Sequence, residues 1–181
     1  MANRLGDPTA RSLGRLTLNP LAHIDWIGTV LFPLVAMVSG APLIGWAKPV
    51  PVDFRYLKSP RRDFALVAAA GPASNLVLAI AGSLVHAAIA GKTGEVTALS
   101  TVDHFVVSFV FLNILLAVFN MIPVPPLDGG NVAIGVLPPQ LGRLFAAMRP
   151  WGFLILYALM FTGILWRITL PVESAIAQWL L

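Results

Sequence analysis

Four long apolar runs constrain this chain more than any other feature. They cover residues 27–47, 64–90, 104–122 and 151–170. A helix of about 20 predominantly apolar residues crosses the hydrocarbon core of a bilayer, and each run has close to that length or more. Charged residues make up only 11% of the chain and hydrophobic residues 57%, whereas a soluble domain carries about a quarter charged residues. The sequence therefore predicts an integral membrane protein.

The expected fold is an all-α polytopic membrane protein. It has three to four transmembrane helices, a re-entrant segment and short extended pieces. The spanning helices are expected over 64–90, 104–122 and 151–170, after a polar N-terminal segment at 1–26. The tail, 171–181, carries Glu173 in its first turn and is typical of an interfacial helix. No internal repeat is visible, so we treat residues 1–181 as one domain.

Between these helices the sequence predicts irregular structure. Arg15–Leu18 alternates in the manner of a short strand, and the prolines of Lys48–Asp53 hold that stretch extended. Residues 123–150 form a bend rich in proline and glycine. A short helix is expected there around Leu141–Met148.

The distribution of lysine and arginine predicts the orientation of the first run, 27–47. Three arginines precede this run, and five basic residues follow it in the loop 48–62 (Lys48, Arg55, Lys58, Arg61 and Arg62). Basic loops stay in the cytoplasm, so both flanks belong on the same side. We therefore expect a re-entrant hairpin that turns near Gly40-Ala41-Pro42. The alternative is a single kinked spanning helix.

The net charge of +4 does not indicate a nucleic-acid partner. The basic residues lie next to the apolar runs, where they meet anionic lipid headgroups. The chain has no cysteine, which excludes disulfides and thiolate metal ligands. The expected partner of most of its surface is the lipid bilayer.

The most informative polar residue is Asp128, which follows the apolar run 104–122 in the stretch PVPPLDGG (123–130). A carboxylate at or near hydrocarbon depth costs several kcal/mol unless it is paired, protonated or bound to a cation. The surrounding prolines and glycines unwind the helix, and irregular backbone at that depth is tolerated only where protein buries it or water lines it. Asp128 is therefore a candidate site residue.

A second candidate lies on the run 64–90. Small residues and Asn75 recur there every four positions (Gly71, Asn75, Ala79, Ser83, Ala87 and Gly91), a stripe that lets a neighbouring helix approach closely. Pro72 removes a backbone donor near Asn75. Asn75 either forms a hydrogen bond to a facing helix or contacts a ligand, and the spacing does not decide between the two.

Taken together, these residues resemble the site-2 protease family of intramembrane zinc metalloproteases. The resemblance rests on GPASN (71–75), NMIP (120–123), PPLDGG (125–130) and GWAKPVPV (45–52), and it extends from about Ala2 to Trp151. It implies that Asp128 is a ligand of Zn²⁺. It also implies that Asn75 contacts the substrate strand or the developing oxyanion, beside substrate-binding Gly71, Pro72 and Asn120. The substrates would be transmembrane or membrane-proximal peptides, cleaved by a multi-pass protein of a prokaryotic cell membrane.

One part of the family pattern is missing. The family takes two histidine ligands and a glutamate base from a His-Glu-x-x-His helix, and no such motif occurs in these 181 residues. The histidines present, His23, His86 and His104, are not spaced to replace it. Either the chain lacks an N-terminal segment or it is a degenerate homologue. We therefore expect weak or absent zinc binding by this chain alone.

Three functions remain open at this point. The first is a zinc-dependent intramembrane endopeptidase. The second is a catalytically inactive pseudoprotease that binds membrane proteins. The third is a small transporter or channel subunit, since an intramembrane carboxylate beside a broken helix also occurs in transporters.

Overall fold

A computed structural model describes residues 1–17, 19–40, 45, 47–48, 50–90 and 97–181. The described residues form helices and connecting segments, with no strand among them, which confirms the expected all-α fold. The contacts group the chain into two units, Met1–Phe64 and Ala65–Leu181, which meet within one long helix. The prediction that both belong to one domain stays a prediction.

The first unit contains short helices. They are η1 (Ala2–Leu5), α1 (Thr9–Ser12), η2 (Pro20–His23), the π-helix η3 (Trp26–Leu31), α2 (Phe32–Ser39) and η4 (Phe54–Tyr56). Arg15–Thr17 have no regular secondary structure, so the expected strand at Arg15–Leu18 is wrong for these residues, and Leu18 lies outside the described part. Asp53 is extended, with φ −97° and ψ 109°, as expected from the prolines before it.

A buried carboxylate ties the two ends of this unit together. Asp7 has no exposed surface and accepts hydrogen bonds from the backbone N–H of Thr9 at 2.9 Å and of Asp53 at 2.9 Å. The Thr9 hydroxyl donates a third, at 2.5 Å. Burial opposes ionisation of Asp7, but these hydrogen bonds outweigh it and hold the pKa of the carboxyl group below its ordinary value.

The apolar segment that follows has its two ends side by side. The backbone N–H of Lys48 donates to the carbonyl oxygen of His23 at 2.8 Å. Between them, α2 ends at Gly40, which has the left-handed φ of +68°. Residues 41–44, including Ala41 and Pro42 of the expected turn, lie outside the described residues. A re-entrant hairpin enters and leaves the membrane on the same side, so its two ends must lie close together, as they do here. The entry of this segment into a membrane stays a prediction.

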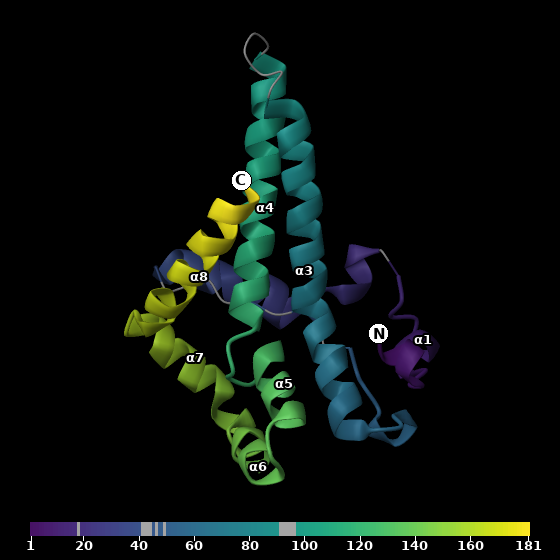
Figure 1. The fold of residues 1–181 in the computed structure, drawn as a ribbon. Helices are drawn as coiled ribbons and strands as arrows, with labels where there is room; N and C mark the ends of the chain where they lie inside the picture. Colours follow the sequence, from purple (N-terminus) through teal and green to yellow (C-terminus); the bar gives the residue numbers. More distant parts are fainter. Residues whose placement is uncertain (18, 41–44, 46, 49, 91–96) are drawn as a thin grey trace. The chain divides into compact units, whose positions relative to one another are not determined.

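The second unit is built on two long helices, α3 (Pro60–Ala90) and α4 (Thr97–Asn120). They lie side by side in Figure 1, and both are long and apolar enough to cross a membrane. A Cβ atom built on Gly82 would lie 2.8 Å from Cγ2 of Val110, so a small residue is required at this crossing. Both helices begin before the apolar runs at 64–90 and 104–122, because polar residues extend them beyond the apolar core.

The remaining helices follow in order from the end of α4. They are α5 (Asp128–Val136), α6 (Pro139–Ala147), η5 (Arg149–Trp151), α7 (Gly152–Phe161) and α8 (Ile164–Leu180). The short helix expected around 141–148 is therefore present as α6. The helix α5 was not expected. In Figure 1, α7 rises from the α5–α6 pair, and α8 continues to the middle of α4.

The structure differs from the expected single helix at 151–170. Helix α7 ends before Thr162, and Gly163, with φ +72°, directly precedes α8. A left-handed glycine ends a helix without the steric cost that other residues meet. The third candidate span consequently covers 139–161. The expected interfacial tail, 171–181, is the second half of α8, which continues through Pro171.

The core of this unit lies where three helices meet. It contains Ala79 of α3, Val110 and Ile114 of α4, and Ala177 of α8. The Ser83 hydroxyl donates to the carbonyl oxygen of Leu180 in the last turn of α8. Ala79 and Ser83 belong to the stripe of small residues, so these two positions serve close helix packing, as that pattern predicts.

Candidate functional site

Asp128 is the first residue of α5, directly after a tightly folded loop. The loop is closed by backbone hydrogen bonds from Leu127 to Val124 at 3.0 Å and from Gly130 to Leu127 at 3.1 Å. A Cβ atom on Gly129 would overlap the carbonyl oxygen of Met121, and one on Gly130 would lie 2.5 Å from the nitrogen of Pro125. The two glycines after Asp128 are therefore required for close backbone packing.

The carboxylate of Asp128 faces Gly71 of α3. A Cβ atom built on Gly71 would lie 2.9 Å from Oδ2 of Asp128 and 3.9 Å from its Cγ. Asp128 can approach α3 this closely because Gly71 has no Cβ atom. The structure thus brings together the GPASN and PPLDGG segments, which the sequence singled out separately.

The carboxyl group of Asp128 is half-buried. In the sequence, Asp128 lies between the second and third candidate spans. Burial raises the pKa of its carboxyl group above the ordinary value. Among the described residues none donates a hydrogen bond to it, while its place in the first turn of α5 favours a negative charge. A bound cation would offset the cost of burial and keep the carboxyl group ionised.

Asn75 lies one helical turn beyond Gly71 and is half-buried. In the part of the chain that the structure describes, its side-chain amide has no hydrogen-bond partner, so it is free to donate to a bound molecule. Pro72 is buried within α3. No hydrogen bond links Asn75 or Pro72 to Asp128 within the described ranges.

Asn120 is placed differently from the other candidates. Its Nδ2 donates to the carbonyl oxygen of Leu116 at 2.9 Å, within its own helix α4. This bond occupies one amide proton and leaves the side-chain oxygen as an acceptor. The structure therefore brings Gly71 and Asp128 into contact and records no such contact for Asn120.

The residues around Asp128 do not form a complete zinc site. Zinc needs three protein ligands in a catalytic site, and the described residues contain no group of three or more potential metal ligands. Each histidine has another partner: His23 contacts the carbonyl oxygen of Thr17, and His104 that of Ser100. Asp128 contributes one carboxylate, fewer ligands than a catalytic zinc site needs.

The third histidine forms an interaction that the sequence did not indicate. Nδ1 of His86 on α3 lies 2.6 Å from Oδ1 of Asp103 on α4. The two residues lie 17 positions apart on different helices. The closeness of the two side chains could have been anticipated only from the register of α3 against α4, and hydropathy does not give that register.

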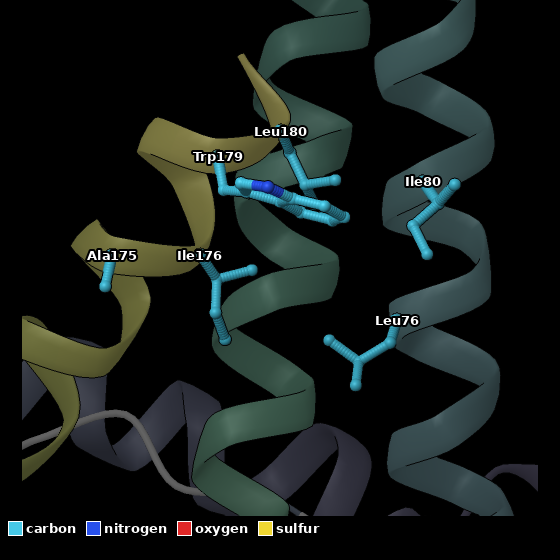
Figure 2. A pocket seen from close by; sticks show the side chains of 6 residues that line it. All are labelled: Leu76, Ile80, Ala175, Ile176, Trp179 and Leu180. Carbon is cyan, nitrogen blue, oxygen red and sulfur yellow. The ribbon is translucent and has the colours of Figure 1, made fainter.

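An open apolar pocket lies between α3 and α8, with a volume of about 390 Å³. It is lined by Leu76, Ile80, Ala175, Ile176, Trp179 and Leu180. Figure 2 shows Leu76 and Ile80 on α3 and Trp179 on α8 at this pocket. An indole N–H only donates, and the other side chains are aliphatic, so the pocket offers no metal ligand.

The chain is similar to a peptidase family and to two proteins named as putative zinc metalloproteases. Residues 82–162 match the sequence pattern described as peptidase family M50. A Bacillus subtilis (strain 168) protein named "Putative zinc metalloprotease YwhC" is 38% identical over 164 residues, which cover 90% of this chain and 72% of that protein. A Mycolicibacterium smegmatis (strain ATCC 700084 / mc(2)155) protein named "Putative zinc metalloprotease Rip2" is 32% identical over 172 residues, 91% of this chain and 60% of the relative. No solved structure matches the chain.

Proposed function

Because the chain belongs to peptidase family M50, we propose that it is an intramembrane zinc metalloendopeptidase of the site-2 protease type, which hydrolyses peptide bonds of membrane proteins. The observation that carries the proposal is the contact between Gly71 and Asp128, where Oδ2 lies 2.9 Å from the position of a Cβ atom. Two segments far apart in the sequence meet there around an anionic oxygen. Both segments belong to the pattern by which the chain resembles this family.

Asp128 is the proposed metal ligand of the site. Its carboxylate is half-buried and has no hydrogen-bond donor among the described residues, so a bound cation would supply the compensation that burial requires. A complete catalytic zinc site needs three protein ligands, and the described residues contain no group of three or more potential ligands. Zinc binding by this chain therefore stays part of the proposal.

Asn75 is the proposed contact to the substrate. A free amide one turn from Gly71 can donate to a peptide carbonyl that lies along α3, and such a donor is worth most where negative charge develops during the reaction. Gly71 leaves space beside Asp128, and Pro72 leaves the carbonyl of Ala68 without its usual helical partner. The oxygen of Asn120 offers a further acceptor at the end of α4.

The proposed substrates are transmembrane or membrane-proximal peptides. The three candidate spans indicate a membrane protein, and Gly71, which Asp128 faces, is exposed on one of them. We assign the protein to the cell membrane of a prokaryote as a multi-pass protein. The two relatives named above come from bacteria, which agrees with this assignment.

The proposal is tested with the purified protein in lipid vesicles, supplied with zinc and a peptide of membrane-spanning sequence. Cleavage by this chain alone should be weak, because the described residues contain no group of three potential metal ligands, and Asp128→Asn should reduce it at least tenfold. Asp103→Asn is the matched control, because it removes the same charge from the pair with His86 and leaves Gly71 and Asp128 intact. An Asp128→Asn variant as active as the control would exclude Asp128 from the site. A parent protein that binds the peptide without cutting it would instead support the pseudoprotease.

A further inference from the structure

The position of Asp128 depends on a segment that the sequence did not connect with it. We propose that the junction of η5 and α7 positions the Asp128 carboxylate against α3, through Gly152 and Arg149. These two act as positioning residues, and neither touches the carboxylate in a contact that the structure records. The inference rests on the proposed function in one respect, which is that Asp128 is the proposed metal ligand.

The first contact is between Gly152 and the loop before Asp128. Gly152 is the buried first residue of α7, and a Cβ atom there would overlap the carbonyl oxygen of Pro125 and lie 3.0 Å from Cδ of Pro126. Main chain therefore rests on main chain at this point. Any side chain at residue 152 would move either α7 or the loop.

Pro125 is held from its other side as well. Its nitrogen lies 2.5 Å from the position of a Cβ atom on Gly130, in the first turn of α5. Pro125 is fully buried and so lies between two glycines, one from α5 and one from α7. A displacement of α7 would thus be transmitted through Pro125 to the turn that carries Asp128.

The second contact holds α5 itself. Nη2 of Arg149 in η5 donates to Oδ1 of Asn131 at 3.1 Å. Asn131 lies three residues after Asp128, on neighbouring positions of one face of α5. Arg149 and Gly152 therefore fix the same turn from two directions: Gly152 supports the loop that enters α5, and Arg149 holds its first turn.

This arrangement makes a prediction that simple packing does not. If the junction only contributed to stability, a change there would lower stability and leave the remaining native molecules with Asp128 in place. If it positions Asp128, the distance between α3 and Asp128 should change in molecules that remain folded. The readout must therefore report that distance separately from stability.

The absence of cysteine from the chain makes such a readout direct. In the variant Gly71→Cys/Asp128→Cys, the two thiols can form only one intramolecular disulfide. The sulfur at residue 128 would lie near the position of the present Cγ, 3.9 Å from Cβ of residue 71, so a small shift suffices for a sulfur–sulfur bond of about 2.05 Å. The rate of disulfide formation on mild oxidation measures how well the two positions face each other.

Into this parent we would introduce Gly152→Ala and Arg149→Ala, with the unfolding temperature measured for each. Both should slow disulfide formation at least threefold. Asn131→Asp keeps an acceptor for Arg149 and should retain the parental rate. Gly82→Ala is the matched control: its new methyl group would lie 2.8 Å from Val110, so it should lower the unfolding temperature with no change in rate.

Unchanged rates in Gly152→Ala and Arg149→Ala would overturn the inference, as would an equal loss of rate in Gly82→Ala. A parent that forms no disulfide would overturn it too, because Asp128 would then not face Gly71. The proposed function is judged apart, from peptidase activity with Asp128 intact. If Gly152→Ala slows disulfide formation yet leaves cleavage unchanged, the positioning of residue 128 by Gly152 is supported and the proposed role of Asp128 in cleavage is contradicted.

Discussion

Replacing Gly71 by alanine should separate activity from stability. Gly71 lies inside the long helix α3 and is exposed, and alanine in an exposed helix interior is more favourable than glycine by about 1 kcal/mol. The new methyl group would lie 2.9 Å from Oδ2 of Asp128. Ordinary contact begins at 3.4 Å, so the end of the Asp128 side chain must move by about 0.5 Å, a shift that a flexible side chain makes at little cost.

The expected effects on stability and activity therefore have opposite signs. The stability of Gly71→Ala should be unchanged or higher. Activity should fall about tenfold, because a misplacement of 1 Å at a reacting centre costs up to about 100-fold and half that shift correspondingly less. A tenfold loss is a change of about 1.4 kcal/mol in the activation free energy.

The assay compares cleavage of a membrane-spanning peptide with the unfolding temperature of the same preparation. Gly82→Ala, three turns along α3, is the control. Its methyl group would lie 2.8 Å from Val110 and 3.2 Å from Phe109, so it should lose stability and keep its specific activity while folded. If Gly71→Ala is as active as the unmodified protein, the closeness of α3 to Asp128 has no part in catalysis, and the reasoning fails.

Three further predictions concern other parts of the chain. Because hydrogen bonds lower the pKa of Asp7, its contribution to the stability of the first unit should be complete above about pH 4 and lost as the pH falls further. Asp7→Asn should remove this pH dependence and lower the free energy of unfolding by about 1–3 kcal/mol at neutral pH, measured by chemical unfolding. A pH profile of stability that the substitution leaves unaltered would contradict the assignment. A double-mutant cycle on His86→Ala and Asp103→Asn should give a coupling energy of about 1–2 kcal/mol, and additive effects would show that the pair contributes nothing. Cysteines at Leu21 and Lys48 should both react with a membrane-impermeant maleimide from the same side; reaction from opposite sides would favour the kinked spanning helix.

The parts of the fold that follow from hydropathy were predictable. The runs 64–90 and 104–122 identified α3 and α4, because a membrane span needs little more than length and apolar character. The amphipathic helix α6, Pro139–Ala147, agrees with the expectation at 141–148 within two residues at its start and one at its end. These features depend on residues close together in the sequence.

The break at Gly163 could not be seen in the same way. Thr162 and Gly163 lie within an apolar run, and glycine is frequent inside spanning helices, so composition does not mark a turn there. The Thr162 hydroxyl donates to the carbonyl of Ala158 at 2.7 Å, which satisfies it within the end of α7. The turn is thus stabilised by local hydrogen bonding and backbone geometry, which the mean hydropathy of the segment does not reveal.

The start of α5 was missed for a different reason. Proline and glycine at 123–130 indicated irregular backbone, and the loop is irregular up to Leu127. Gly129 and Gly130, however, lie inside a helix, where they allow close approach to Met121 and Pro125. Composition alone does not distinguish a glycine that frees the backbone from one that removes a side chain at a contact.

That distinction bears on how the candidate site is built. At Gly163 the positive φ of +72° requires glycine, and a Cβ atom would meet nothing within 4 Å. At Gly71, Gly129 and Gly152 the backbone φ is not positive, and a Cβ atom would instead approach an oxygen, either the Asp128 carboxylate or a main-chain carbonyl. Asp128 is therefore surrounded by positions whose missing side chains set its distance from α3. A methyl group at Gly71 meets only the flexible end of the Asp128 side chain, whereas one at Gly129 or Gly152 meets main chain that must move, so alanine at Gly71 is the sharpest probe of the carboxylate.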